Sequence, residues 1–237
     1  MVNFLKPAFW FPPPHPLIAR NREAFAQFDQ SRPLADYTFV VCDTELTGFD
    51  RKRDEIISIG AVVIRDLQID LGATFHHYIR PVKSEHTRAT LIHRITPQQL
   101  LEARPLEEVL PDFVEFAGNS LMVGHYVALD MDFLNRAAQK VFGGTLSNPG
   151  IDTMRMAQGY RRVHLGHFHQ EDGHSFSYAL EDLAKEYNLP LFKSHDALED
   201  AMQTAYLFLF LLKKFRKGGL LTLKDIYRAG RVGSLWY

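Results

Sequence analysis

The 237-residue sequence contains a single cysteine, Cys42, so the chain cannot form an intramolecular disulfide. It also lacks a long hydrophobic run, because the longest apolar stretch, residues 205–212, is far shorter than the roughly 20 residues of a membrane-spanning helix. No signal-peptide pattern is visible near the start, where Lys6, Pro7 and residues 12–14 interrupt the apolar residues. These absences predict a protein without membrane contact in a reducing, cytoplasmic compartment.

The sequence has no marked excess of charge of either sign. It contains 27 basic and 28 acidic residues, for a net charge of −1. Proteins that hold long duplexes through many phosphates carry a clear basic excess. We therefore expect any contact with nucleic acid to be short, and we interpret the basic clusters at 51–53, 161–162 and 213–217 as solvated surface by default.

The apolar residues predict an α/β fold. Three strand-like runs come first, at 38–42, 56–64 and 73–80, before any long helix. Helices and short strands then alternate. One helix is expected to start at Thr96-Pro97, and four more are expected at 106–117, 130–141, 177–187 and 197–215. Two short strands are expected, one at 121–124 and one that begins at 151. A meander followed by alternation implies a mixed sheet with helices on its faces.

The two ends of the sequence differ from its middle. Residues 1–36 contain Phe9-Trp10-Phe11 beside a proline run and a weak helical pattern from 17 to 30. We expect an arm packed on the main domain, and a partner-docking element is the alternative. The predicted division is an N-terminal arm at 1–36, a main domain at 37–215 and a C-terminal tail at 216–237.

Asp43 and Glu45 follow the first strand directly. Side chains alternate along a strand, so residues at i and i+2 project from the same face. Two adjacent carboxylates repel each other unless protons or cations neutralise them, and oxygen ligands of this kind select Mg²⁺ or Mn²⁺. A D-x-E pair is common by chance, but its place after a buried strand and before Thr47-Gly48 adds to its weight.

Two later segments supply further acidic residues. Asp130 lies in the first turn of a predicted helix, where the helix dipole alone would favour an acidic side chain. Asp196 and Glu199 have the spacing of a helix-capping pair, which leaves His195 and Asp200 unexplained. Asp200 lies in the second turn of a helix that must be buried, so its carboxylate needs a cation or hydrogen bonds.

Together these segments resemble the histidine branch of the DEDD exonuclease superfamily, over residues 37–215. The family's opening motif D-x-E-T-T-G is similar to Asp43-Thr44-Glu45-Leu46-Thr47-Gly48. Its H-N-x-x-F-D-x-x-F-L motif matches at His125, Asp130, Phe133 and Leu134, and its H-x-A-x-x-D motif matches at His195, Ala197 and Asp200. The segments H-G-I-T and D-T resemble His93-Arg94-Ile95-Thr96 and Asp152-Thr153.

The resemblance implies a ribonuclease H-like fold, in which a five-stranded mixed sheet has helices on both faces. It implies 3′→5′ exonuclease activity that releases nucleoside 5′-monophosphates from the 3′ end of DNA or RNA. Asp43, Glu45 and Asp200 would hold one Mg²⁺ or Mn²⁺ ion, and Asp43 and Asp130 a second. His195 would accept the proton of the attacking water, since histidine side chains ordinarily titrate near pH 6.5.

The resemblance also places a set of residues around a single-stranded or frayed 3′ end. These expected substrate-binding residues are Thr44, Leu46, Thr47, His93, Thr96, His125, Tyr126 and Phe133. The sequence departs from the family pattern at Leu46 and Tyr126, where threonine and asparagine are usual, and at Arg94, where glycine is usual. These departures bear on substrate preference more than on catalysis, since every expected ligand and the histidine are present.

Three alternatives stay open at this point. The chain could be a polymerase-bound proofreading subunit that docks a partner through its terminal arms, or a non-catalytic nucleic-acid-binding module of the same fold. The sequence does not decide between DNA and RNA. Four histidines between 164 and 174 could bind zinc, but the absence of a nearby cysteine favours a loop that flanks the substrate.

Overall fold

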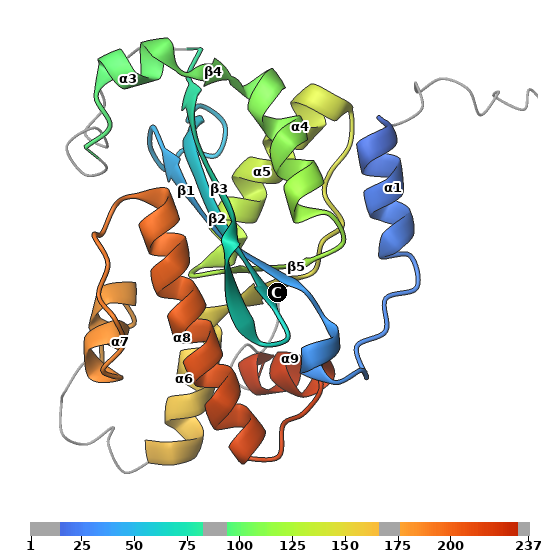
Figure 1. Ribbon diagram of the computed structural model, residues 1–237, viewed down its shortest axis with the longest axis vertical. Coiled ribbons are helices and arrows are strands. Elements are labelled where there is room, and N and C mark those ends of the chain that lie inside the picture. Colours follow the sequence, from blue (N-terminus) through green and yellow to red (C-terminus); the bar gives the residue numbers. More distant parts are fainter. Residues whose placement is uncertain (1–14, 83–93, 166–175, 232–237) are drawn as a thin grey trace, which may run out of the picture.

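The computed structural model describes residues 15–82, 94–165 and 176–231, without the side chains of 163–165 and 230–231. Within these ranges one sheet has the strand order β4-β3-β2-β1-β5-β6 (Figure 1). The strands are β1 (Phe39–Leu46), β2 (Ile56–Arg65), β3 (Gln68–Arg80), β4 (Arg104–Pro105), β5 (Leu121–Gly124) and β6 (Gly150–Asp152). Strands β1, β2 and β3 form an antiparallel meander, and β5 and β6 continue the sheet in parallel with β1.

The predicted mixed α/β sheet is confirmed, but the expected number of five strands is too low for the described residues. The sixth strand, β4, has two residues and pairs in parallel with the end of β3 through Ile79–Arg104 and Arg80–Pro105. A two-residue strand leaves no alternating pattern, and proline lacks the N–H group that a strand interior needs. No sequence pattern therefore predicts β4.

Helices cover both faces of the sheet (Figure 1). One apolar cluster unites one face with α1 (Pro16–Ala24), α4 (Leu106–Ala117) and α5 (Val127–Phe142). A second cluster unites the other face with α6 (Thr153–Leu165), α7 (Leu180–Glu186), α8 (Ala197–Lys217) and α9 (Leu223–Arg231). The short helix α3 (Pro97–Glu102) lies beside β3, and none of the helices in the described ranges is long and apolar enough to cross a membrane.

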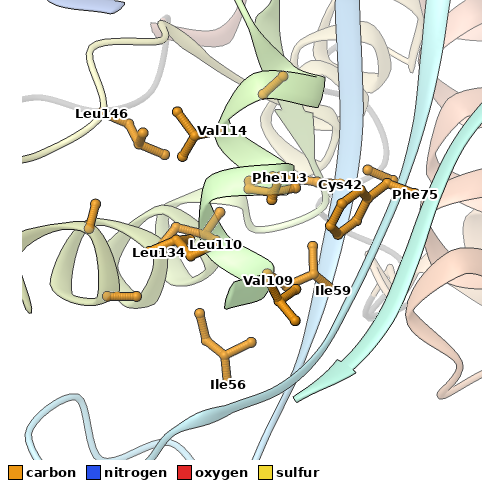
Figure 2. Packing of buried hydrophobic residues seen from close by; sticks show 14 of the residues in the cluster. Cys42, Ile56, Ile59, Phe75, Val109, Leu110, Phe113, Val114, Leu134 and Leu146 are labelled. Atoms are coloured by element: carbon orange, nitrogen blue, oxygen red, sulfur yellow. The ribbon is translucent and has the colours of Figure 1, made fainter. Parts of the chain in front are cut away.

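The alternation along β1 decides where its carboxylates point. Val40 and Cys42 belong to the cluster with α4 and α5, where Figure 2 shows Cys42 beside Phe75 and Phe113. Phe39 and Val41 belong to the opposite cluster with α8. Because side chains alternate, Asp43 and Glu45 continue the α8 face and Thr44 continues the α5 face.

The predicted helix starts are largely confirmed. Thr96 caps α3 in a full capping box with Gln99. Asp196 caps α8 by accepting the N–H groups of Leu198 and Glu199, but the Glu199 carboxylate instead accepts the N–H of Lys193 at 2.6 Å. Two predicted boundaries were wrong: α5 begins at Val127 instead of Asp130, and α7 begins at Leu180 instead of Ser177.

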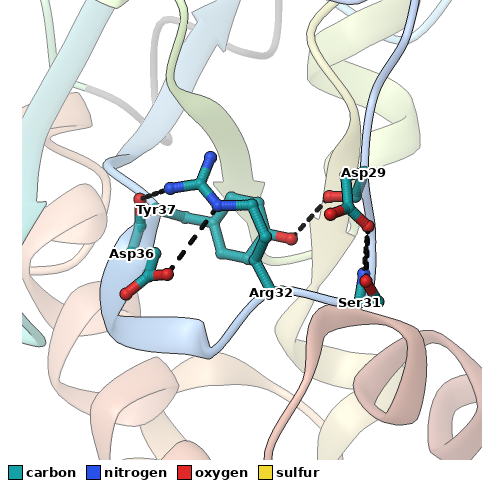
Figure 3. Close-up of polar contacts among 5 residues, drawn as sticks. All are labelled: Asp29, Ser31, Arg32, Asp36 and Tyr37. Carbon is teal, nitrogen blue, oxygen red and sulfur yellow. Dashed lines mark hydrogen bonds and ion pairs between the residues drawn. The ribbon is translucent and has the colours of Figure 1, made fainter.

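The segment before β1 is packed on the sheet domain. Leu17 and Ile18 of α1 are buried in the cluster with α4 and α5. The turn that follows is held by polar contacts (Figure 3). The Tyr37 hydroxyl donates to the carbonyl of Asp29 at 2.6 Å, and the Arg32 guanidinium donates to the carbonyl of Asp36 at 3.0 Å. These contacts fix the path of the chain into β1.

The segment after α8 returns to the same region. Leu223 and Ile226 of α9 are buried against the cluster with α6 and α8, and Pro33 forms an antiparallel bridge with Thr222. The aromatic segment at 9–11, for which partner docking was the alternative, and the C-terminal residues 232–237 lie outside the described residues. The division at 36 and 215 therefore stays a proposal.

Gly60 of β2 sets the position of α8, and we expect Gly60→Ala to destabilise the protein strongly. A Cβ atom at this position would lie 2.1 Å from the carbonyl carbon of Ala197 and 2.1 Å from the nitrogen of Leu198. Both are backbone atoms, so the helix itself must move, at an expected cost of about 3 kcal/mol or more in the free energy of unfolding.

Gly72→Ala is the matched control, because a Cβ there meets only the Asp70 carboxylate at 3.4 Å. This change should be neutral or stabilise the protein by up to about 1 kcal/mol. Urea unfolding followed by circular dichroism measures both variants. Equal stability of the two variants would show that α8 does not depend on the missing side chain of Gly60.

Candidate active site

Three carboxylates meet at the end of β1. Asp43 and Glu45 come from β1 and Asp200 from α8, and each contributes one oxygen to a group whose atoms all lie within 4.8 Å of one another. Asp43 pairs with Gly60 in the β1–β2 ladder, and the first turn of α8 rests on Gly60. The close approach of helix to strand therefore brings Asp200, one turn further along, to the carboxylates of β1.

Asp130 joins the group from the other face of the sheet. It is only 5% exposed, and its Oδ1 atom accepts the backbone N–H of Thr44 at 3.0 Å and the Thr44 hydroxyl at 2.7 Å. Thr44 lies between the two carboxylate residues of β1, so Asp130 is tied directly to their strand. The backbone N–H and the hydroxyl of Thr44 both donate to this oxygen, so Thr44 fixes the position of the Asp130 carboxylate.

The pKa values of all four acidic groups are raised above their ordinary values. Burial is the main cause for each, and it raises the pKa of Glu45 to about 7 and that of Asp130 to about 7. The pKa of Asp43 lies well above its ordinary value because of burial and then of repulsion from Asp130, Asp200 and Glu45. Burial also raises the pKa of Asp200.

The raised pKa values of these clustered carboxyl groups are what a site for a divalent cation would show in the absence of the cation. Buried carboxylates at such short range need protons or cations to neutralise them, and hard oxygen donors are the ligands of Mg²⁺ and Mn²⁺. The acidic cluster therefore has the composition and spacing of a divalent metal site. Asp43, Glu45 and Asp200 are the three described residues whose oxygens are gathered for it.

His195 lies immediately before the N-cap of α8. Its φ of 67° is in the left-handed region, which few non-glycine residues adopt. In this conformation its backbone N–H donates to Oδ2 of Asp200 at 2.8 Å, while its side chain is exposed. The main chain of His195 thus fixes the Asp200 carboxylate and leaves the imidazole free to face solvent.

His125 and Tyr126 connect β5 to α5 beside this site. The His125 ring contacts the Thr153 hydroxyl at 2.9 Å and the Tyr178 carbonyl at 2.8 Å. Burial lowers the pKa of His125, which favours a neutral ring whose Nε2–H donates to that carbonyl. Tyr126 has a φ of 61°, and half of its surface is exposed. His125 therefore joins three segments, and Tyr126 faces outward.

The loop after β1 is ordered around Asp54. The Asp54 carboxylate accepts the Thr47 hydroxyl at 2.8 Å and the N–H of Asp50 at 2.7 Å. A Cβ on Gly48 would lie 2.5 Å from this carboxylate, so any larger residue there would have to displace the Asp54 side chain from these hydrogen bonds. The ring of Phe49 at the tip of this loop is 77% exposed.

The other expected substrate residues differ in their surroundings. Leu46 is 7% exposed, and Phe133 is 2% exposed within the core between β1 and α5. Thr96 is exposed, but its hydroxyl belongs to the cap of α3. His93 and most of the histidine-rich loop lie outside the described residues.

Sequence reasoning missed Phe49 and Ser58. Ser58 faces Glu45 across the β1–β2 ladder, is fully buried, and its hydroxyl has no hydrogen-bond partner among the described residues. The register of the ladder is what reveals Ser58, and a single sequence does not give that register. Phe49 could have been noticed as an aromatic residue in a loop next to the D-x-E motif, but none of the motifs includes it.

The raised pKa values predict how the metal-free protein responds to pH. Glu45 is protonated more readily in the folded state than in the unfolded state, whose pKa is 4.5, so the folded state binds more protons between pH 4.5 and about 7. Stability in EDTA should therefore fall as pH rises through this window. We expect the melting temperature to be a few degrees higher at pH 5 than at pH 7.5 because of this group.

Glu45→Gln is the control for this effect, since it removes one titrating group and should reduce the pH dependence measured by scanning calorimetry in EDTA, while Asp130, whose pKa is also about 7, keeps its own share. Mn²⁺ should also restore stability at pH 7.5 in the wild type but much less in the variant. A wild-type protein whose stability in EDTA rises between pH 5 and 7.5 would contradict the assigned direction.

Comparison with known proteins places the chain in a family. The profile of the RNase T exonucleases matches residues 40–208. A PolC-type DNA polymerase III from Thermotoga petrophila is 37% identical over 209 residues, which cover 88% of this chain and 14% of that relative. The DNA polymerase III subunit epsilon of Aquifex aeolicus is 33% identical over 181 residues, which cover 76% of this chain and 83% of that subunit.

The solved structures agree on the fold. A structure of exonuclease X in complex with 5′ overhanging duplex DNA superimposes with a TM-score of 0.59 at 23% identity, covering 81% of this chain and 99% of that one. The ribonuclease H-like architecture expected from the sequence is thereby confirmed. With the family profile over residues 40–208 and the acidic cluster at the end of β1, the chain belongs to the RNase T family of exonucleases.

Proposed function

We propose that this protein is a metal-dependent 3′→5′ exonuclease of the histidine branch, which releases nucleoside 5′-monophosphates from the 3′ end of a DNA strand. The observation that carries the proposal is the group of Asp43, Glu45 and Asp200 within 4.8 Å, set in the frame of an exonuclease family. His195 at the start of α8 supports the histidine branch. DNA is favoured over RNA because the two relatives named above belong to DNA polymerases.

In this proposal Asp43, Glu45 and Asp200 hold one divalent cation, Mg²⁺ or Mn²⁺, and Asp43 and Asp130 hold a second. When bound, the two cations would stabilise the negative charge on the attacking and leaving oxygens of an in-line displacement at phosphorus. The protein's own part is to keep the carboxylates in place. Thr44 fixes Asp130 through two hydrogen bonds, and the main chain of His195 fixes Asp200 through one.

His195 is the proposed general base. Its backbone is tied to Asp200, and its exposed imidazole can reach a water molecule that lies at the carboxylate group. The imidazole takes one proton from that water as the water oxygen attacks phosphorus. The bond from phosphorus to the 3′ oxygen of the preceding nucleotide breaks, and this oxygen takes a proton from solvent water to become the free 3′-hydroxyl group of the shortened strand.

The substrate residues divide into those that can touch a nucleotide and those that support the site. Tyr126 and Phe49 are exposed aromatics four positions from Asp130 and from Glu45, respectively, and they can stack on bases. Leu46, Thr47 and Thr96, together with His93, are proposed to line the place of the terminal nucleotide. Thr44, His125 and Phe133 are proposed to support the site from inside the protein, because Thr44 holds Asp130, His125 contacts Thr153 and Tyr178, and Phe133 is 2% exposed.

A proofreading role is the second proposal. It is supported by the match to PolC-type DNA polymerase III and to the epsilon subunit, both of which are parts of replicative polymerases by name. Co-purification of the full chain with a polymerase subunit, and faster removal of a mismatched than of a matched 3′ nucleotide, would support it. A protein that acts alone, with no preference for mismatches, is the free-standing nuclease.

The central test uses purified protein with Mn²⁺ on single-stranded DNA, 3′-recessed DNA and single-stranded RNA, each labelled at the 5′ end. We expect a ladder of products that shortens one nucleotide at a time from the 3′ end. EDTA should abolish it, and Mn²⁺ or Mg²⁺ should restore it. Internal fragments, or release of the 5′-terminal nucleotide first, would refute 3′→5′ exonuclease activity.

A further inference from the structure

A groove of about 290 Å³ lies beside the acidic group without being part of it. Its walls come from the loop between β1 and β2, the end of β3, the first residues of α4 and the middle of α5. The two helices lie on the same side of the sheet (Figure 1). The volume equals that of about ten water molecules, so the groove accepts a group much larger than a single ion.

The charged side chains of this groove are predominantly basic. Two are acidic, Glu55 and Glu107, and five are basic: Lys52, Arg53, Arg80, Arg136 and Lys140. The whole chain has a net charge of −1, so this is a local concentration of positive charge on a protein that has no basic excess overall. Such a concentration in a concave surface attracts anions.

Two of the five basic side chains form ion pairs inside the protein, and one of these is Arg53 with Asp50 at 3.7 Å. The Glu107 carboxylate pairs with Lys140 at 3.2 Å. Arg136 instead donates to the carbonyl oxygens of Arg51 and Asp54, which carry no net charge. No ion pair or hydrogen bond of the Lys52 or Arg80 side chain is present among the described residues. The groove therefore keeps at least two cationic side chains available for a ligand.

The groove adjoins the acidic group along two elements. Ile56 in its wall faces Leu46 across the β1–β2 ladder, and Leu46 directly follows Glu45. Phe133 in its wall lies three residues after Asp130 on α5, a distance of about 4.5 Å along the helix axis. The groove and the acidic group therefore share two elements, the end of the β1–β2 ladder and the first half of α5, although Leu46 points to the α5 face and Glu45 to the α8 face.

We propose that this groove binds the phosphodiester backbone of the substrate strand, upstream of the nucleotide that is removed. The inference rests on the proposed function, since it needs a strand at the acidic group. The ligand chemistry is a chain of phosphate anions, which lysine binds as a point charge and arginine binds through two parallel N–H groups. The groove holds the strand in register while the acidic group acts on its end.

The test compares a long substrate with one that has no upstream phosphates. The variant is Lys52→Ala with Arg80→Ala, measured on a 20-nucleotide single-stranded DNA and on thymidine 5′-p-nitrophenyl phosphate. We expect KM for the 20-mer to rise about tenfold, and the slope of log KM against log salt to fall by about 1.4, since each contact with single-stranded DNA contributes about 0.7. Hydrolysis of the small diester should be unchanged.

Lys213→Ala with Lys217→Ala is the matched control. It removes the same charge from exposed positions on α8, about 20 and 25 Å along the helix from Asp200. This variant should behave as the wild type on both substrates. An unchanged KM for the 20-mer in the groove variant, or an equal loss of activity on the small diester, would overturn the proposal.

A binding measurement tests the groove proposal independently of the proposed exonuclease activity. Fluorescence anisotropy of a 5′-labelled 20-mer in EDTA requires no hydrolysis. Weaker binding by the groove variant than by the control supports the groove even if no nuclease activity is found. Equal binding by the two variants overturns it, and points to an acidic protein segment as the ligand of these basic side chains.

Discussion

Asp200→Ala should lower exonuclease activity by at least about a hundredfold, as expected when one ligand is removed from a metal site. The Asp200 carboxylate is the contribution of α8 to the acidic group, and no other described residue of α8 supplies an oxygen to it. The loss should appear in kcat at saturating Mn²⁺ and grow at low Mn²⁺. Initial rates on labelled single-stranded DNA over a range of Mn²⁺ concentrations measure both.

The same residue should not be needed for folding. Its charge raises the pKa values of Asp43 and Glu45, so its removal relieves repulsion in the metal-free protein. Asp200→Asn is the sharper form of the experiment, because the amide oxygen can still accept the His195 N–H. We expect its melting temperature in EDTA to equal that of the wild type or exceed it by a few degrees.

Glu199→Ala is the matched control for Asp200, since it removes a neighbouring carboxylate of the same helix that bonds to the Lys193 N–H instead of joining the acidic group. Its activity should stay within a few fold of the wild type. A metal-free Asp200→Asn protein that is strongly destabilised would make Asp200 a structural residue and remove it from the proposed metal site.

His195→Ala should lower turnover by roughly 10²–10⁴, the usual contribution of a general base. The bond from His195 to Asp200 uses the main chain, so the variant should keep the carboxylate in place and bind Mn²⁺ with nearly unchanged affinity. Single-turnover rates and isothermal titration with Mn²⁺ measure the two quantities separately. A loss confined to the rate is what a proton acceptor predicts.

The left-handed conformation of His195 complicates the alanine variant. Alanine at a φ of 67° costs about 1–2 kcal/mol, whereas asparagine tolerates this region well. His195→Asn should therefore keep the wild-type melting temperature and still lose the same activity, because an amide cannot accept the proton at neutral pH. A His195→Asn protein that cleaves DNA at the wild-type rate would exclude His195 as the base.

The sequence predicted those parts of the fold that depend on local signals. The first buried strand, the N-caps at Thr96 and Asp196, and the buried helix after Asp196 all follow from neighbouring residues, and the structure confirms them, although β1 continues past the expected end at 42 to Leu46. The strand β4 was missed because two residues cannot form a pattern. The first turns of α5 and α7 were misplaced because neither Tyr126 nor Ala179 makes a side-chain cap.

The candidate site was predictable in its residue types but not in its construction. Resemblance to a family supplied Asp43, Glu45, Asp130 and Asp200, whose roles stay proposals. No local signal could show that Thr44 uses both its polar groups on Asp130, because the two residues are 86 positions apart. The contact between Gly60 and α8 is equally long-range, and Gly60 alone looks like an ordinary strand glycine.

The acidic group is assembled from three distant parts of the chain, and this has a consequence during protein synthesis. Asp43 and Asp200 are separated by 157 positions, which ribosomes translate in about 8–30 s at rates of 5–20 residues per second. Until α8 emerges and packs on Gly60, the nascent chain holds only part of the acidic group. The proposed metal site is therefore completed only when most of the domain has been made.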